Sequence, residues 1–106
     1  MTVEVADGQV WWADLPGDKI RPVVVLTRGH VASLLSRVLV APVTSTVRGI
    51  PTEVAVGVSE GLREGSVANL DNVFLLETGR LLQMTGAVPA HRWHEFCTAI
   101  GKVLGC

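Results

Sequence analysis

The sequence predicts a small, mostly antiparallel β-barrel that is capped by one C-terminal helix. Many short apolar stretches are separated by glycine and proline turns, which is typical of antiparallel all-β domains. Only residues 89–104 show the three-and-four spacing of an amphipathic helix. A chain of 106 residues, 48% of them hydrophobic, is long enough to bury one modest core. We therefore expect residues 1–106 to form a single domain.

The apolar stretches and the turns between them place the expected strands. Uninterrupted apolar runs at 23–26 and 38–43 predict strands that are buried on both faces. Pro42 predicts a bulge or a sheet edge near the end of the second run, because proline cannot donate to a ladder. Residues 29–36 fit either a short helical turn or an irregular edge. The six expected strands are residues 9–15, 20–27, 37–43, 52–56, 66–76 with a kink after residue 70, and 83–88.

Two tryptophans and the ends of the helix add local expectations. Trp11 and Trp12 are adjacent in a strand, so one should enter the core and the other should cover a surface or an interface. Pro89 suits the first turn of the helix, and Gly105 is a natural stop.

Charge is distributed unevenly along a nearly neutral chain. The net charge of −1 argues against a bulk basic nucleic-acid binder. From Lys19 to Thr52, however, there is no aspartate or glutamate, so one face could carry positive charge and suit a polyanion or an acidic peptide. The alternative is that strand ends simply carry solvated arginines. The cationic residues of this acid-free window are Lys19, Arg21, Arg28, Arg37 and Arg48, with His30 beside them.

Three polar positions are candidates for chemistry, and each has a structural alternative. Arg21 precedes Pro22 at the start of a buried strand, where its fork could clamp a phosphate or pair with Asp14 or Asp18. Thr44, with the hydroxyls that follow it, could donate to a ligand or satisfy turn backbone. Asp71 is the best carboxylate candidate for a base, or it forms an Asx-turn at the kink.

Neither a metal nor another cofactor is expected. His91 and His94 lie one helical turn apart without a third ligand, and Cys97 and Cys106 form no metal-binding pair. The longest apolar run is far short of a membrane span, and residues 1–9 show no secretory signal. Since two cysteines indicate no disulfide scaffold, we expect a cytoplasmic protein with no membrane partner.

The order of the motifs resembles the MazF/PemK (Kid) family of toxin endoribonucleases from bacterial type II toxin–antitoxin modules. Gly8-x-Val-Trp-Trp-Ala-Asp-Leu is similar to the opening strand of that family, and Arg21-Pro22 with its valine run is similar to the next strand. The resemblance covers nearly the whole chain. It continues through residues 40–45, 50–54 and 66–72, then Arg80-Leu81 and Gly86.

The resemblance implies an SH3-like barrel that dimerises and cuts single-stranded RNA without a metal. It implies neutralisation by a small MazE-like antitoxin, with DNA contacted only indirectly through the antitoxin complex. The cleaving residues of the family map onto Arg21 and Thr44, and an aspartate used in the plasmid branch aligns with Asp71. The acid-free window then becomes the RNA track, for which the candidates are Lys19, Thr27, Arg28, Ser45, Thr46, Arg48, Asn69 and Asn72.

This chain also departs from the family pattern in three places. Asn69 stands where the plasmid branch uses an arginine, which leaves a different division of catalytic labour open. The loop at 16–20 is short, and Gln9 replaces a usual acidic residue. Two rival functions remain, a non-catalytic SH3-like binding module and a toxin of the same fold that inhibits DNA gyrase. Toxins of the second kind depend on a Trp-Gly-Ile-like C-terminal end, whereas this chain ends Leu-Gly-Cys.

Overall fold

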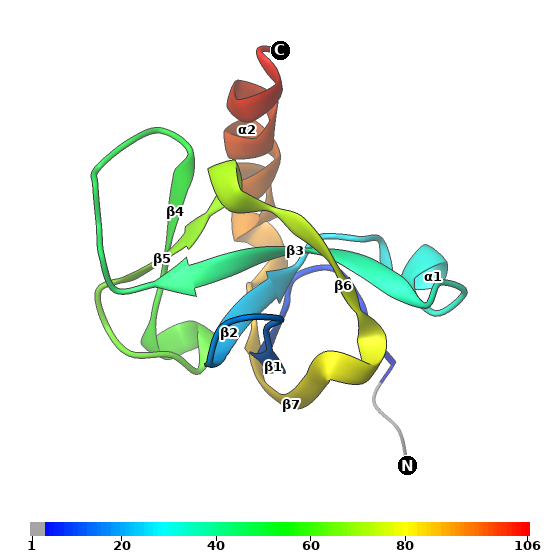
Figure 1. The fold of residues 1–106 in the computed structure, drawn as a ribbon. Helices are drawn as coiled ribbons and strands as arrows, with labels where there is room; N and C mark the ends of the chain where they lie inside the picture. Colours follow the sequence, from blue (N-terminus) through cyan, green and yellow to red (C-terminus); the bar gives the residue numbers. More distant parts are fainter. Residues whose placement is uncertain (1–3) are drawn as a thin grey trace.

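The computed structural model describes residues 4–106, so the expectation of no secretory signal at residues 1–9 falls partly outside it. Its strands form one curled antiparallel sheet in the order β4-β5-β3-β2-β1-β7, with β6 paired to β3 off this path (Figure 1). The strands are β1 Gln9–Asp14, β2 Ile20–Val25, β3 Arg37–Thr44, β4 Glu53–Val56, β5 Ser66–Asn69, β6 Phe74–Glu77 and β7 Leu81–Ala87. The helices are α1 Gly29–Ala32 and α2 Trp93–Leu104. This half-barrel with a C-terminal helix confirms the predicted fold class.

Strands β2 and β3 form the centre of the sheet and are buried on both faces, as their apolar runs predict. In β2, Val24 belongs to one core cluster, whereas Val23 and Val25 belong to a second cluster on the other face. Helix α2 closes the first cluster with Phe96 and Ala99. The curl of β6 and β7 closes the second cluster, which holds Leu76 and is packed by Phe74, Leu81 and Met84.

Pro42 lies in neither a bulge nor an edge strand, which corrects the sequence-based expectation. It pairs with Val23 in the middle of the sheet. The backbone N–H and C=O of Leu39 both face β2, so alternation turns Pro42 to the opposite side of β3. On that side, β3 pairs with β6 only as far as Val40, and its pairing with β5 starts at Val43. Proline is tolerated because it occupies the gap between two partner strands.

The remaining boundaries differ from the predictions mainly where turns intervene. The stretch 66–76 divides into β5 and β6 around a 3₁₀ turn, η2 Leu70–Asn72, at the expected kink. The last strand begins earlier than predicted, at Leu81. The helix predicted from residue 89 opens instead with a 3₁₀ turn, η4 Ala90–Arg92, and ends at Gly105, whose φ of 77° is left-handed.

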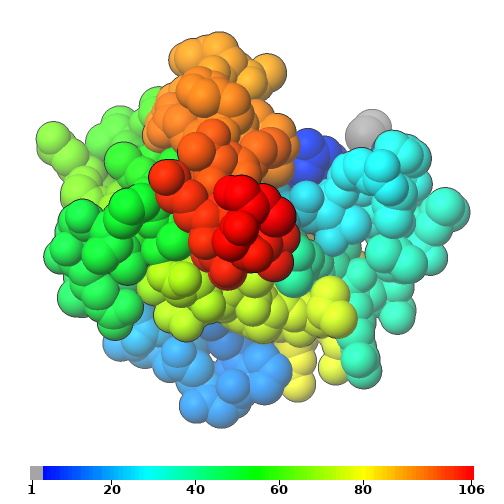
Figure 2. Space-filling view, turned by 90° about the horizontal axis from the view of Figure 1, so that it is seen from above, coloured from blue at the N-terminus to red at the C-terminus, as the bar shows by residue number. Residues whose placement is uncertain are grey.

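Side chains along β1 and the α1 region settle two open expectations. Trp11 is buried at 9% exposure and Trp12 is 38% exposed, so the adjacent rings divide between core and surface as expected. Residues 29–32 form a short helix, α1, which resolves the ambiguity of that segment. Figure 2 shows α2 end-on, with the β3–β4 segment on one side of it and the α1 segment on the other. In the described part of the chain, no helix has the length and apolar character needed to cross a membrane.

Candidate active site

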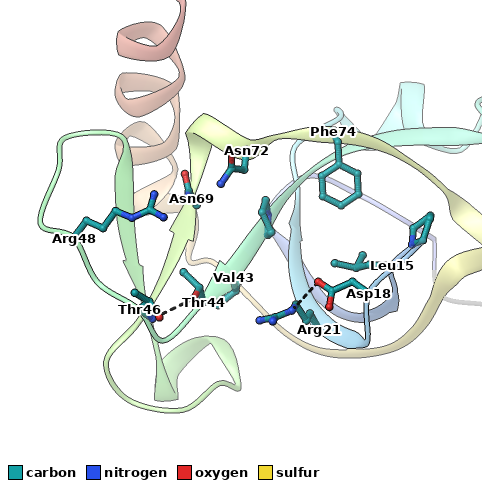
Figure 3. Close-up of a pocket in the computed structure, with 12 residues that line it drawn as sticks. Leu15, Asp18, Arg21, Val43, Thr44, Thr46, Arg48, Asn69, Asn72 and Phe74 are labelled. Carbon is teal, nitrogen blue, oxygen red and sulfur yellow. Dashed lines mark hydrogen bonds and ion pairs between the residues drawn. The ribbon is translucent and has the colours of Figure 1, made fainter.

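A hollow of about 590 Å³ opens at the end of the sheet where β2 begins and β3 ends (Figure 3). The start of β2, the end of β3, the loop that follows β3 and the region of η2 all contribute side chains to it. Six of the predicted site residues therefore come together from four segments of the chain. The lining consists of Leu15, Pro16, Asp18, Arg21, Pro42, Val43, Thr44, Thr46, Arg48, Asn69, Asn72 and Phe74.

Among the residues that the structure describes, Arg21 forms one ion pair at the hollow and retains most of its donors. Its Nε donates to Asp18 Oδ2 at 3.0 Å, so the pairing considered as the alternative is present. The Lys19 backbone N–H also donates to Asp18 at 2.7 Å and, with Arg21, keeps the pKa of that carboxyl below its usual value. A guanidinium has five N–H donors, so the two Nη groups remain for a ligand. In Figure 3 the guanidinium extends from Asp18 toward Thr44.

Thr44 offers an oriented hydroxyl on the other side of Arg21. It ends β3, whose packing between β2 and β5 fixes the backbone. The Thr46 backbone N–H donates to Thr44 Oγ1 at 3.1 Å. Because this bond occupies an oxygen lone pair, the hydroxyl proton stays free to be donated into the hollow. Thr44 can therefore satisfy the turn backbone and donate to a ligand at the same time.

Asp71 has a different environment from Arg21 and Thr44. Within residues 4–106 it falls outside the lining of the hollow, and its carboxylate accepts a hydrogen bond from Thr52 Oγ1. The Asx-turn at the kink is made by Asn69 and not by Asp71, because Asn69 Oδ1 accepts the Asp71 backbone N–H at 3.0 Å. The carboxylate therefore helps to hold η2 against the start of β4.

The other predicted RNA contacts are split between the two ends of β2. Thr46, Arg48, Asn69 and Asn72 line the hollow with Arg21. Of the described residues, Lys19 and Ser45 adjoin the lining in sequence without forming part of it. Thr27 and Arg28 follow the opposite end of β2, and the Thr27 hydroxyl accepts from the Leu39 backbone N–H at 2.8 Å.

Several lining residues were missed by the sequence analysis as site residues. Asp18 was considered only as an ion-pair partner, and Phe74 only as part of a strand. Phe74 is a partly exposed ring that could stack a base. No sequence signal marked it, because its place depends on the η2 turn that separates β5 from β6. In the described part of the chain, no three histidine, cysteine or acidic side chains are grouped so as to hold a metal ion.

Comparisons with known proteins give one consistent family. Residues 6–104 match the family described as PemK-like, MazF-like toxin of type II toxin–antitoxin system. The probable endoribonuclease MazF5 of Mycobacterium tuberculosis is 36% identical over 107 residues, covering 100% of this chain and 98% of that protein. The endoribonuclease MazF3 of the same species is 42% identical over 85 residues, covering 80% of this chain and 82% of the relative.

Solved structures agree with the sequence relatives. The Mycobacterium tuberculosis toxin MazF-mt6 has a TM-score of 0.86 at 37% identity, covering 92% of this chain and 96% of that one. A mycobacterial endoribonuclease in complex with its cognate antitoxin has a TM-score of 0.85 at 32% identity, covering 95% of each chain. The family match at residues 6–104 spans the strands and loops that build the hollow. The chain therefore belongs to the PemK-like, MazF-like toxins of type II toxin–antitoxin systems.

Proposed function

We propose that this protein is a metal-independent endoribonuclease toxin that cuts single-stranded RNA and is neutralised by a cognate MazE-like antitoxin. The observation that carries the proposal is the convergence of Arg21 and Thr44 on one hollow, each with donors free for a phosphate. The relatives, which cover 100% and 80% of this chain, are named endoribonucleases, which supports an enzyme over a non-catalytic binding module or a gyrase inhibitor.

The reaction that fits these residues is attack of the ribose 2′-hydroxyl on its own phosphate. The new P–O bond closes a 2′,3′-cyclic phosphate, and the bond to the 5′-oxygen breaks and leaves a 5′-hydroxyl. Arg21 stabilises the charge that develops on the phosphorane, and the Thr44 hydroxyl donates to a phosphate oxygen. The guanidinium is a poor proton donor because arginine is not deprotonated in proteins.

Two groups are considered as acceptors of the 2′-proton, namely Asp71 and a water molecule. Water is favoured, since the Asp71 carboxylate already receives the Thr52 hydroxyl and lies outside the described lining of the hollow. The leaving 5′-oxygen needs a proton, which comes from solvent or a neighbouring acid. The protein then contributes mainly charge and positioning, which are large terms in phosphoryl chemistry.

The RNA track follows from the positions of the polar residues around the hollow. Thr46, Arg48, Asn69 and Asn72 would hold the nucleotides next to the scissile phosphate, with Lys19 and Ser45 at the margin. Thr27 and Arg28 would contact RNA only if the strand extends along β2 to its other end. The acid-free window thus supports a cationic RNA track, and most of its predicted contacts lie at or beside the hollow.

The biological setting is part of the same proposal. A related endoribonuclease is described in complex with its cognate antitoxin, which supports an antitoxin as the partner of this chain. We propose a homodimer of single-domain chains, residues 1–106, that acts in the cytoplasm. DNA would be contacted only through the antitoxin complex.

The test is incubation of the purified protein with RNA in EDTA, followed by mapping of the new ends. Wild type should produce 2′,3′-cyclic phosphate and 5′-hydroxyl ends at a recurring sequence, which also identifies the preferred motif. Arg21→Ala should lower kcat by about 10²–10³-fold, the usual effect of removing one transition-state donor. The matched control is Arg63→Ala, which removes an exposed arginine from another loop. Intact RNA, or cleavage that needs a divalent metal, would contradict the proposal.

A further inference from the structure

One carboxylate binds the backbone of the loop between β3 and β4. Glu53, the first residue of β4, accepts backbone N–H bonds from Arg48 at 3.1 and 3.2 Å and from Gly49 at 2.9 Å. Two successive N–H groups directed at one anion form an anion-binding concavity of the kind called a nest. Here the concavity is filled from within the chain. Gly49 has a φ of 73°, a conformation that glycine adopts readily and that other residues adopt at a cost.

Glu53 is itself fixed by the sheet. It pairs with Asn69 in the β4–β5 ladder, and its backbone N–H donates to Ile50 O at 3.1 Å. Its side chain therefore projects from a rigid strand into the loop. The position of the Arg48 backbone then depends on a carboxylate anchored in β4.

This arrangement leaves the Arg48 side chain available to a ligand. The Glu53 carboxylate is engaged with backbone N–H groups, and no carboxylate of residues 4–106 lies within ion-pair distance of the Arg48 guanidinium. Figure 3 shows this guanidinium pointing from the loop inward toward Asn69. The charged residues of the lining are Asp18, Arg21 and Arg48. Since Asp18 balances Arg21, the net positive charge of the hollow corresponds to Arg48.

We propose that Arg48 binds a phosphate next to the scissile one, and that Glu53 is a positioning residue which acts through Arg48. This inference rests on the proposed function, because it takes RNA as the ligand of the hollow. It assigns the β3–β4 loop the task of fixing substrate register, while Arg21 and Thr44 serve the reacting phosphate. Glu53 improves RNA binding even though its own charge repels RNA.

The sign of the Glu53 effect distinguishes this role from simple electrostatics. Removing a carboxylate near a polyanion site should tighten binding if charge alone matters. If Glu53 orders the loop that carries Arg48, its removal should weaken binding instead. Gly49→Ala gives the same test without a change of charge. A Cβ at Gly49 meets no atom within 4 Å, so its main effect is backbone strain in the loop.

The experiment measures the Kd of a short single-stranded 2′-O-methyl oligonucleotide, which cannot be cut, together with KM and kcat on RNA. Arg48→Ala should weaken binding about tenfold and leave kcat nearly unchanged, as expected for loss of uniform binding. It should also reduce the slope of log K against log salt by about 0.7, the contribution of one phosphate contact in single strands. Glu53→Ala and Gly49→Ala should weaken binding about threefold or more through the loss of loop order.

Controls separate a local effect from unfolding. Arg63→Ala removes the same charge outside the hollow and should bind as wild type. Glu53→Gln keeps a carbonyl acceptor and should fall between wild type and Glu53→Ala; it is also the fallback if the alanine variant does not fold. The double variant Arg48→Ala/Glu53→Ala should bind no more weakly than Arg48→Ala, because Glu53 acts through Arg48.

The possible outcomes distinguish this inference from the proposed function. If Glu53→Ala and Gly49→Ala bind the oligonucleotide as tightly as wild type or more tightly, the role of the loop is overturned. If wild type cuts no RNA but binds the oligonucleotide in a Glu53-dependent way, the binding role of Arg48 and Glu53 stands and the proposed cleavage fails. Weaker binding by Glu53→Ala and Gly49→Ala, with binding by Arg63→Ala unchanged, supports the role of the loop.

Discussion

Arginines occupy two regions of this molecule in different ways. At the junction of β4 and α2, Arg92 donates to Glu95 through Nε and Nη2, both at 2.9 Å, and to Ala55 O at 2.6 Å. Its Nη1 also lies 3.4 Å from Glu60 Oε1. At the hollow, and within residues 4–106, Arg21 uses only Nε, on Asp18. An arginine whose arms are all engaged within the chain stabilises the fold, whereas one with free donors at a hollow is available to a ligand.

The carboxylates in the two regions show the same difference. Glu60 is only 1% exposed and also accepts from the Gly57 backbone N–H at 2.8 Å and from the Ser59 hydroxyl. Asp18 is exposed, and its pKa is lowered first by the Lys19 backbone N–H and then by Arg21. Loss of the cation therefore has unequal consequences. It leaves a buried charge uncompensated in one region and a solvated charge in the other.

Arg92→Ala should give the largest change in stability. Removing one partner of a buried ion pair costs about 3 kcal/mol or more, because Glu60 loses its cation in a desolvated position. The free energy of unfolding from urea titration should fall by that amount, whereas Arg21→Ala should change it by less than about 1 kcal/mol. RNA cleavage per folded molecule should show the reverse order.

Glu60→Gln provides the control for the Arg92 prediction. A neutral amide at this position needs no cation, so Arg92→Ala should destabilise the Glu60→Gln protein less than it destabilises wild type. Equal destabilisation by Arg21→Ala and Arg92→Ala would contradict the distinction between the two regions.

The fold was largely predictable from the sequence because its strongest signals are local. The valine runs of β2 and β3, the kink before residue 71 and the Gly105 stop were all placed by residue type. Pro42 was misjudged because the gap between β5 and β6 is a property of the whole sheet. The helix start was misplaced because residues 90–92 form a 3₁₀ turn, with the Arg92 backbone N–H donating to Pro89 O at 2.9 Å.

The candidate site was only partly predictable, for a related reason. Arg21 and Thr44 stand at strand ends, where sequence position already implies exposure at a rim. The Glu53 nest depends on hydrogen bonds between a strand and a loop that no spacing rule describes. Asp71 resembled a catalytic carboxylate in sequence, although its partner Thr52 comes from another strand region.

Asp71 sharpens the comparison because its carboxylate is engaged in the fold yet lies near the hollow. Asp71→Asn keeps an acceptor for the Thr52 hydroxyl but removes the ability to take a proton. We expect kcat to fall less than tenfold in this variant, against the loss of about 10²–10⁴-fold expected for a general base. Asp71→Ala and Thr52→Val should each lower the free energy of unfolding by about 1 kcal/mol. A large loss of kcat in Asp71→Asn with unchanged stability would make Asp71 the base.

The smallest predicted effect is the pH dependence of stability that arises from Glu95, the partner of Arg92. The Arg92 hydrogen bond holds the pKa of Glu95 below its usual value, with Arg92, His94 and His91 charges adding to it. A carboxyl with a depressed folded pKa adds stability above its unfolded pKa, about 4.3, and loses it as pH falls through the lower folded value. Glu95→Gln should therefore destabilise at neutral pH and converge with wild type in acid. Because the Glu95 side chain is 38% exposed, solvent screening limits the difference to under about 1 kcal/mol.

Urea titrations of wild type and Glu95→Gln across acidic and neutral pH measure this difference directly. Glu64→Gln is the matched control, since Glu64 is an exposed carboxylate in a loop and its removal should give no comparable pH-dependent difference. A constant gap between wild type and Glu95→Gln at every pH would mean that packing, not charge, is what Glu95 contributes. A gap that closes in acid would instead show that the charge of Glu95, paired with Arg92, contributes to the free energy of unfolding.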